Sequence, residues 1–236
     1  KSNYQTPLPG VEWLRKFLGV DVFAAIESVE IGNRATLDHA DLFAFPAMRS
    51  LYLKKAGVID EDLKSIGQLT SLRQISVESA AVTDDGARHL GKLRKLHRLA
   101  LVDTQINGSG LGWMQAIPKW YIISLVDSPI QNVKFLEGVQ SIFLLELVDC
   151  PIGDDGLESI RRVKKIEMLT LNGTKITDHG LNHLESHVQL HGLNLSNSMI
   201  TDAGLNSLRG LVNLTYIHLR NTLISGEGLV HFHDLS

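Results

Sequence analysis

A phrase that is written twice is the strongest constraint on what this chain can fold into. The segment NGTKITDHGLNHL at residues 172–184 returns as NSMITDAGLNSL at residues 197–208. Self-similarity at a fixed period of this size indicates a stacked repeat architecture. One unit cannot bury its own apolar face, so successive units have to pack against one another. The sequence therefore predicts a solenoid.

The period extends along nearly the whole chain. Short alternating apolar runs recur at intervals of 22 or 24 residues, and the second apolar residue of each run can serve as an anchor. The nine anchors are Ile31, Leu53, Val77, Leu101, Leu125, Leu147, Leu171, Leu195 and Leu219. An apolar-x-apolar pair such as Leu193-Asn194-Leu195 is typical of a strand with one buried face, whereas Leu205, Leu208 and Leu211 have a helix-like spacing. Each unit is predicted to supply a strand and a short helical segment.

Between strand and helix, several units carry a Thr-Asp pair followed by glycine. Thr83-Asp84, Thr177-Asp178 and Thr201-Asp202 have the chemistry of a helix N-cap, because their side-chain oxygens can accept from first-turn amides. The glycine two residues after each Asp is expected to allow close packing against the adjacent turn. Units after Ile31 and Leu125 are two residues shorter, and SPIQNVKFLEG lacks the phrase altogether. A short, irregular helical segment is predicted there.

These features carry a resemblance to a known family. Runs such as LTLNGTKITDHGLNHL and LNLSNSMITDAGLNSLRGLVNL resemble leucine-rich repeats, in particular the bacterial TDxGL type abundant in planctomycetes. The resemblance covers about residues 26 to 235. It implies an α/β right-handed solenoid, with a curved parallel sheet on the concave side and helices or 3-10 turns on the convex side. It also implies a binding scaffold without an active site or a cofactor.

The two ends of the chain are expected to differ from its middle. Residues 11–27 have an amphipathic helical pattern, and we assign residues 1–28 to an N-terminal helical cap that is similar to the cap of such proteins. Residues 29–236 are assigned to about nine repeats, within the same structural domain and incomplete at the C-terminal end. The strand at 217–219 is predicted to be a free parallel edge, which is a natural place for self-association.

Composition narrows the classes of partner and compartment. A formal net charge of −3 and a pI near 6.4 give no basic footprint, so a nucleic-acid partner is not expected. No run of 18 apolar residues is present, so this fragment is not expected to insert into a membrane. The chain opens without Met or a signal peptide. An anchor or export signal could lie upstream, and otherwise a cytoplasmic location is expected, so the compartment stays open.

The candidate binding site is a group of outward-facing residues on the middle strands. Residues that flank the buried pair of each strand should point away from the core, and in the middle units they are apolar. The predicted patch consists of Val102, Ile122, Val126, Leu144, Val148 and Met168. An exposed apolar patch with a polar rim marks a protein-binding surface. The alternative is that valine and isoleucine simply suit strands.

Three carboxylates border this patch. Asp103, Asp127 and Asp149 follow three successive strands at the same position. Because neighbouring strands lie about 4.8 Å apart, the three carboxylates are predicted to form an acidic ladder. Two interpretations are open: the ladder binds a cation or the basic side chains of a partner, or the aspartates cap backbone amides in the turn. We favour capping, which needs no ligand. Cys150 follows in phase with small turn residues, so we interpret it as a turn-lining residue rather than a nucleophile.

Histidine offers the remaining chemistry. His179, His183, His187 and His191 are spaced by four, which raises the question of a metal site on one helix face. The repeat phase argues against it, because His187 aligns with Leu211 and other core positions; we expect a buried, hydrogen-bonded histidine. No GxSxG, HExxH, P-loop or CxxC motif is present. The sequence thus predicts a non-catalytic scaffold that binds a protein or peptide, and the alternative is a spacer that self-assembles through its C-terminal edge.

Overall fold

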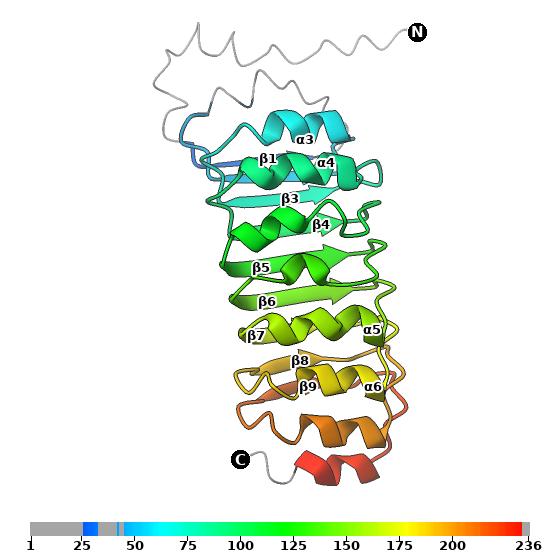
Figure 1. Ribbon diagram of the computed structural model, residues 1–236. Helices are drawn as coiled ribbons and strands as arrows, with labels where there is room; N and C mark the ends of the chain where they lie inside the picture. Colours follow the sequence, from blue (N-terminus) through cyan, green and yellow to red (C-terminus); the bar gives the residue numbers. More distant parts are fainter. Residues whose placement is uncertain (1–25, 33–41, 43–44, 233–236) are drawn as a thin grey trace, which may run out of the picture.

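The fold is built on one parallel sheet. The computed structural model describes residues 26–32, 42 and 45–232. Within these residues, nine strands pair in chain order, each parallel to the next (Figure 1). The strands are β1 (Ser28–Gly32), β2 (Ser50–Lys54), β3 (Gln74–Glu78), β4 (Arg98–Val102), β5 (Lys119–Val126), β6 (Ser141–Val148), β7 (Lys165–Thr170), β8 (Gly192–Asn194) and β9 (Tyr216–His218).

The pairing register follows the sequence period. Leu101 pairs with Leu125, and Leu125 pairs with Leu147, so the anchors of three successive units lie side by side. The register is kept across the interval of 22 residues between β5 and β6, because the two missing residues come from the connection and not from a strand. The prediction that the units stack in phase is confirmed.

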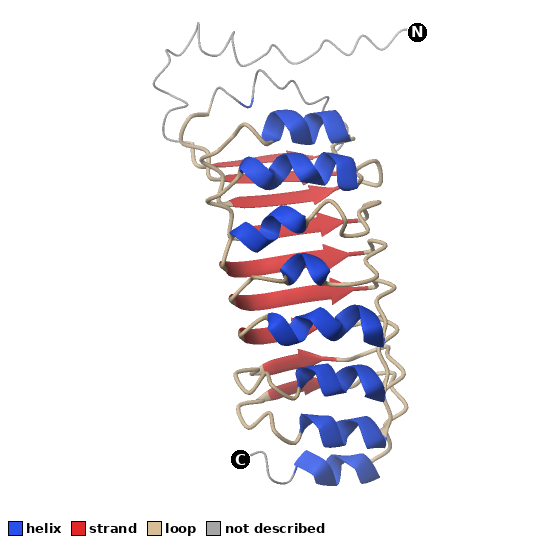
Figure 2. Cartoon of the chain, viewed as in Figure 1, coloured by secondary structure: helices blue, strands red, loops and turns tan. Residues whose placement is uncertain are grey.

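Helical segments connect the strands and lie together on one side of the sheet (Figure 2). Such crossovers are what parallel strands require. The α-helices are α3 (Asp60–Ile66), α4 (Asp84–His89), α5 (Asp154–Leu157) and α6 (Asp178–Leu181). The 3-10 helices are η2 (Leu90–Lys92), η3 (Gly112–Ala116), η4 (Lys134–Leu136), η5 (Glu158–Arg162), η6 (Asn182–Leu184), η7 (Asp202–Leu208) and η8 (Glu227–Phe232). We call the other side of the sheet, which the sequence predicts to be concave, the open face.

The core is one continuous layer between the sheet and the helices. Both residues of the apolar pair on β4, Leu99 and Leu101, are fully buried. The apolar residue five positions after the anchor is also fully buried in unit after unit, at Val58, Val82, Ile106, Ile130, Ile152, Ile176 and Ile200. Burial of one such side chain contributes about 1.5–3 kcal/mol, so the stacking of units is driven mainly by these recurring positions.

Aspartates at the helix starts join each unit to the next. Asp178 accepts a hydrogen bond from the backbone N–H of Thr201 at 2.8 Å and another from the Thr201 hydroxyl at 2.6 Å. The hydroxyl of Thr201 in turn accepts from the N–H of Ala203, which makes Thr201 the N-cap of its own helix. We call this arrangement the Asp–Thr bridge. It recurs from Asp60 to Thr83, from Asp154 to Thr177 and, with serine in place of threonine, from Asp202 to Ser225.

The bridge corrects half of the capping prediction. The threonines do cap their own helices, but the carboxylates of the aspartates satisfy donors of the following unit instead. The recurring glycine is a consequence of this contact. A Cβ atom on Gly204 would overlap the carboxylate of Asp178, and Gly86, Gly180 and Gly228 face the preceding aspartate in the same way. The predicted close packing at glycine is therefore confirmed.

The middle units lack the bridge. Asp84 accepts instead from the backbone N–H groups of Asn107 and Gly110, at 2.9 and 2.6 Å. The helical segments of the next two units are only η3 and η4, which confirms the predicted shortening after Leu125. Both strands there, β5 and β6, have eight residues, against five in β2, β3 and β4. The sheet is thus most extensive where the helical side is shortest.

The described residues include little of the predicted N-terminal cap and most of the last repeat. Of the predicted N-terminal cap, only residues 26–28 belong to the described residues, and Ser28 already begins β1. At the other end, β9 is the last strand in the described part of the chain, and Ile217 and Leu219 are only partly buried, whereas Leu193 and Leu195 are 2% and 0% exposed. Among the described residues, no helix is long and apolar enough to cross a bilayer.

Candidate partner-binding face

The six predicted patch residues lie together on the open face over β4 to β7. Val102 pairs with Val126 and Val126 with Val148, which forms one line across the strands that we call the valine row. Ile122 pairs with Leu144 and Leu144 with Met168, which forms a second line that we call the leucine row. All six side chains are partly exposed. The sequence correctly predicts which residues share this face.

The patch is two apolar rows rather than one continuous surface. Between them runs a middle row of small or polar side chains, formed by Ala100, Ser124, Glu146 and Thr170. Because the two apolar rows are four residues apart along each strand, they are separated by about 13 Å. We call this strip of residues between the two apolar rows the middle row.

Two aromatic residues extend the leucine row, and the alternation rule misses both. Tyr121 and Phe143 are 42% and 37% exposed, and their rings stack with centroids 4.8 Å apart and planes within 4°. The guanidinium of Arg98 lies 4.4 Å from the centroid of the Tyr121 ring. Offset stacking and a cation over a ring each stabilise such an arrangement. The aromatic pair thus stands beside the leucine row.

A kink at the start of the strands explains why these residues are exposed. The carbonyl of His97 accepts from the N–H groups of both Tyr121 and Ile122, so simple alternation fails at this point and consecutive residues reach the surface. Aligning the repeats would have revealed the pair. Other units place polar or charged residues at this position, namely Arg49, Arg73, His97, Glu167, His191 and Thr215.

The acidic ladder borders the valine row. Asp103, Asp127 and Asp149 are exposed, and each has a positive φ close to 50°. This left-handed conformation is tolerated best by glycine, Asn and Asp, and Asn197 and Asn221 adopt it in later units. Their carboxylates accept no hydrogen bond from the described residues, so backbone conformation explains why they recur, and the capping interpretation is wrong.

Metal and nucleophile chemistry finds little support in the described residues. No group of three or more His, Cys, Asp or Glu side chains in that part of the chain is placed to hold a metal ion. Cys150 is 1% exposed, and burial raises the pKa of its thiol to about 11, with the charges of Asp127 and Asp149 adding to the effect. A buried, protonated thiol is a poor nucleophile.

His187 lies in the core, as the repeat phase predicts, but it is not hydrogen-bonded. It is 2% exposed, and neither ring nitrogen has a partner among the described residues. Loss of hydration lowers the pKa of His187, and the nearby backbone of Ile160 offsets only part of this. The pKa of His183 is also lowered, first by partial burial and then by Arg161. The predicted core position of His187 is therefore confirmed, and the Ile160 backbone is a polar neighbour of its ring without forming a hydrogen bond of normal geometry.

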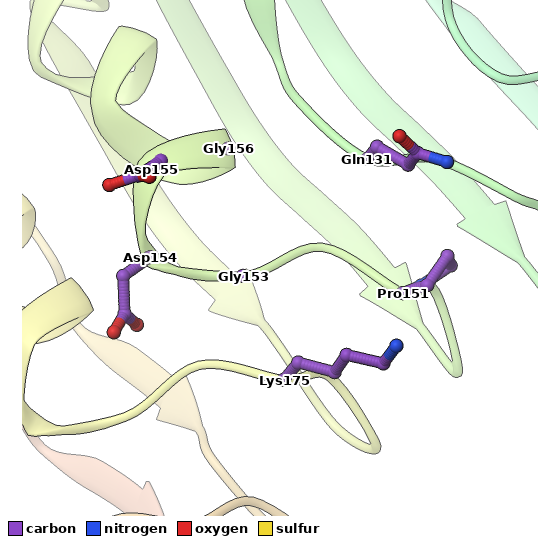
Figure 3. A pocket seen from close by; sticks show the side chains of 7 residues that line it. All are labelled: Gln131, Pro151, Gly153, Asp154, Asp155, Gly156 and Lys175. Atoms are coloured by element: carbon purple, nitrogen blue, oxygen red, sulfur yellow. The ribbon is translucent and has the colours of Figure 1, made fainter.

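A hollow on the helical side is a weaker candidate for a site. It lies where the unit without the bridge meets the next one, and its lining consists of Gln131, Pro151, Gly153, Asp154, Asp155, Gly156 and Lys175 (Figure 3). The carboxylate of Asp154 points away from Lys175 in Figure 3, because it already accepts from the N–H and hydroxyl of Thr177. Its chemistry is thus explained by the Asp–Thr bridge.

Solved structures with the same arrangement are leucine-rich-repeat proteins. An internalin (inlF) from Listeria monocytogenes is 21% identical with a TM-score of 0.71, over 92% of this chain and 61% of its own. Internalin C2 from the same organism is 21% identical with a TM-score of 0.52, over 76% of this chain and 81% of its own. TLR13, in its complex with ssRNA13, is 17% identical with a TM-score of 0.62, over 92% of this chain and 35% of its own.

These likenesses confirm the fold. The protein is an α/β leucine-rich-repeat solenoid, as the sequence predicts. It spans about three fifths of the length of the internalin inlF chain that it matches. Neither a family model nor a curated protein sequence matches it.

Proposed function

We propose that this protein is a non-catalytic scaffold that binds another protein or a peptide through the open face over β4 to β7. The observation that carries the proposal is the pair of apolar rows, with the stacked Tyr121 and Phe143 at their edge, on a face that no described segment covers. Apolar groups framed by charged ones are the composition of protein-binding surfaces.

Strand propensity alone does not explain the patch. If β-branched residues were present only because they suit strands, the outer strands would carry them at the same outward positions. In the leucine row, however, the equivalent residues of β2 and β3 are Ser50 and Gln74, and in the valine row they are Lys54 and Glu78. Outward valine, isoleucine, leucine and methionine are confined to β4 to β7, which favours a localised contact.

Charge supports a protein or peptide rather than a nucleic acid. TLR13 is similar in fold and is seen with ssRNA13, so the fold itself is compatible with an RNA ligand. This chain, however, has a net charge of −3 and an exposed acidic ladder beside the patch. Phosphate backbones require basic surfaces, so we favour a partner that carries basic side chains opposite Asp103, Asp127 and Asp149.

The patch can be tested with a charge placed in either row. Val126→Glu or Leu144→Glu would set a carboxylate against an apolar partner surface, and we expect partner capture from native extracts to fall at least tenfold. Ser76→Glu adds the same charge to the open face of β3 and serves as the matched control. Circular dichroism should be unchanged in all three variants. Equal capture by Val126→Glu, Leu144→Glu and the control would contradict the proposal.

A second candidate function is self-assembly through the C-terminal end. Ile217 on β9 and Leu219 just after it are partly exposed. The exposed apolar residues of the last units include Val212, Leu223, Leu229 and Val230, each at least 50% exposed. An uncovered end of a solenoid core is a surface on which a second copy can stack.

We also infer that the repeats belong to the bacterial TDxGL type. The Asp–Thr bridge gives three residues of that phrase a task in the contact between units, because Thr donates, Asp accepts and Gly leaves room for the carboxylate. This supports a repeat type defined by its inter-unit contact.

A further inference from the structure

The open face carries a second feature that the apolar rows do not include. A hollow of about 350 Å³ lies over β7, β8 and β9, beside the end of the leucine row. It is lined by Met168, Leu169, Thr170, Gly192, Leu193, Asn194, Tyr216 and His218. We call it the Gly192 pocket. This volume is at the small end of the range for ligand sites, so the pocket suits one large side chain.

The pocket exists because one unit has glycine in the leucine row. Met168 pairs with Gly192, and Gly192 pairs with Tyr216. Because Gly192 has no side chain, the thioether of Met168 lies over it and buries it, and the hollow remains between this thioether and the phenol ring of Tyr216. Tyr216 is 65% exposed and forms the opposite wall.

The walls determine what the pocket would accept. Thioethers and aromatic rings both make favourable contacts with an aromatic ring, and methionine adapts its shape to what it meets. Asn194 provides polarity at one side, because its Oδ1 accepts from the N–H of Ser196 at 3.0 Å while its amide N–H₂ donates to none of the described residues. An aromatic side chain that carries an N–H or O–H group would place its ring against Met168 and Tyr216 and its polar group beside Asn194.

A charge lies at a defined distance from the pocket. Asn194 pairs with Thr170, and Thr170 pairs with Glu146, so Glu146 is two strands away in the middle row. Two strand spacings correspond to about 10 Å. Glu146 is partly buried and forms no ion pair with the described residues. A basic group of the partner would therefore find an unpaired carboxylate at this point.

We propose that the Gly192 pocket anchors an aromatic side chain of a peptide segment, and that Glu146 binds a lysine or arginine about three extended residues away. This rests on the proposed function, and it adds the identity of the anchoring side chains. The segment then lies across the strands along the middle row, with its aromatic residue at β8 and its basic residue at β6. Three residues of extended chain span about 10 Å, which matches the distance from the pocket to Glu146.

The probe for the test is the acetylated, amidated peptide Trp-Gly-Gly-Arg. Binding is followed by NMR of ¹³C-methyl methionine, since Met168 lines the pocket and the other three methionines do not. Met48 and Met114 are buried, and Met199 is exposed elsewhere, so they report any nonspecific effect. We expect a saturable shift of the Met168 methyl with a dissociation constant near 1 mM, and steady positions for the other three.

Matched peptides and variants separate the two contacts. Ala-Gly-Gly-Arg should bind at least tenfold more weakly, because it has no ring for the pocket. Gly192→Leu should produce a similar loss by filling the pocket, whereas Ser76→Leu, which adds a leucine to the same face at β3, should have no effect.

The charge contact is tested separately. Glu146→Gln should weaken the binding of Trp-Gly-Gly-Arg about threefold, and Trp-Gly-Gly-Glu should bind the unaltered protein more weakly than Trp-Gly-Gly-Arg. Glu185→Gln, on the helical side, is the control for the charge.

Several results would overturn the inference. These are a Met168 methyl that does not move up to about 10 mM peptide, equal shifts of all four methyls, or unchanged binding by Gly192→Leu. Unchanged binding by Glu146→Gln would overturn the assignment of the basic residue. The pocket inference can fail while the proposed function still holds. If capture of the native partner is lost in Val126→Glu but kept in Gly192→Leu, the patch stands and the pocket inference fails.

Discussion

At the scale of single residues, His187 is the side chain whose chemistry fits its surroundings least. It occupies a position where other units have leucine, isoleucine or valine, and its two ring nitrogens have no partner among the described residues. Burial without a hydrogen bond favours the neutral ring and lowers its pKa. The folded protein therefore binds a proton at His187 less readily than the unfolded chain, in which the pKa of this side chain is near 6.5.

This difference predicts a pH dependence of stability. Above the unfolded pKa of about 6.5, both states carry a neutral His187 and stability is complete. As the pH falls below this value, the unfolded state binds a proton first, so the free energy of unfolding decreases by up to about 1.4 kcal/mol per pH unit. The loss stops at the lowered pKa of the folded state. Chemical denaturation between pH 7.5 and pH 5 measures the slope.

The variant His187→Leu should remove this part of the slope. It should also raise the stability at pH 7.5 by about 1–3 kcal/mol, because an apolar side chain leaves no buried nitrogen unpaired. A smaller slope should remain from His183, whose pKa is lowered as well. A slope that is identical in His187→Leu and the unaltered protein would show that His187 does not titrate as described.

At the scale of the element, the Asp–Thr bridge is the polar contact that fixes one helical segment to the next. Asp178 accepts two hydrogen bonds from Thr201, and hydrogen bonds to a charged group contribute more than neutral ones. We expect Asp178→Asn to lower the free energy of unfolding by about 2 kcal/mol, since an amide cannot accept both donors with the same geometry. Denaturant titration would measure the loss.

Two further variants make this prediction specific. Asp155→Asn changes an exposed carboxylate that accepts no hydrogen bond from the described residues, and it should cost less than about 0.5 kcal/mol. Gly204→Ala should destabilise by an amount similar to Asp178→Asn, because its methyl group would displace the same carboxylate. If Asp178→Asn and Asp155→Asn are equally stable, the bridge contributes nothing to the packing of units.

The same element shows how far sequence alone reaches. The phase of the repeat predicts which residues are buried, where the strands pair and which six residues share the open face, because all of these depend on a period within the chain. It does not predict the partner of Asp178, since periodicity shows that a residue recurs and not which unit it contacts. Tyr121 was missed because of the double hydrogen bond to the His97 carbonyl, which ends the alternation. Phe143 was missed because it lies between the Trp120–Ile142 and Ile122–Leu144 pairs, where the β5–β6 register is interrupted.

At the scale of the whole molecule, the solenoid has an uneven surface. Its middle carries the apolar rows, and its C-terminal end exposes Leu223 and Val230 at 66% and 62%. If that end is an assembly surface, the sedimentation coefficient should rise with protein concentration, and Leu223→Lys should suppress the rise. Val188→Lys, at a site that is 42% exposed within an inner unit, should not. A monomer at every concentration would rule out assembly through this end.

The Asp–Thr bridge also has a direction, because each unit that forms it gives a carboxylate to the unit after it and receives two donors from that unit. An inverted unit would place its carboxylate opposite the carboxylate of its neighbour. A duplicated unit would form the same Asp–Thr bridge that other units already form. A protein assembled in this way can therefore lengthen or shorten its reach in whole steps of about 4.8 Å, one strand at a time, with no new chemistry at the seam. The number of units therefore sets the length of the ligand that such a chain can contact.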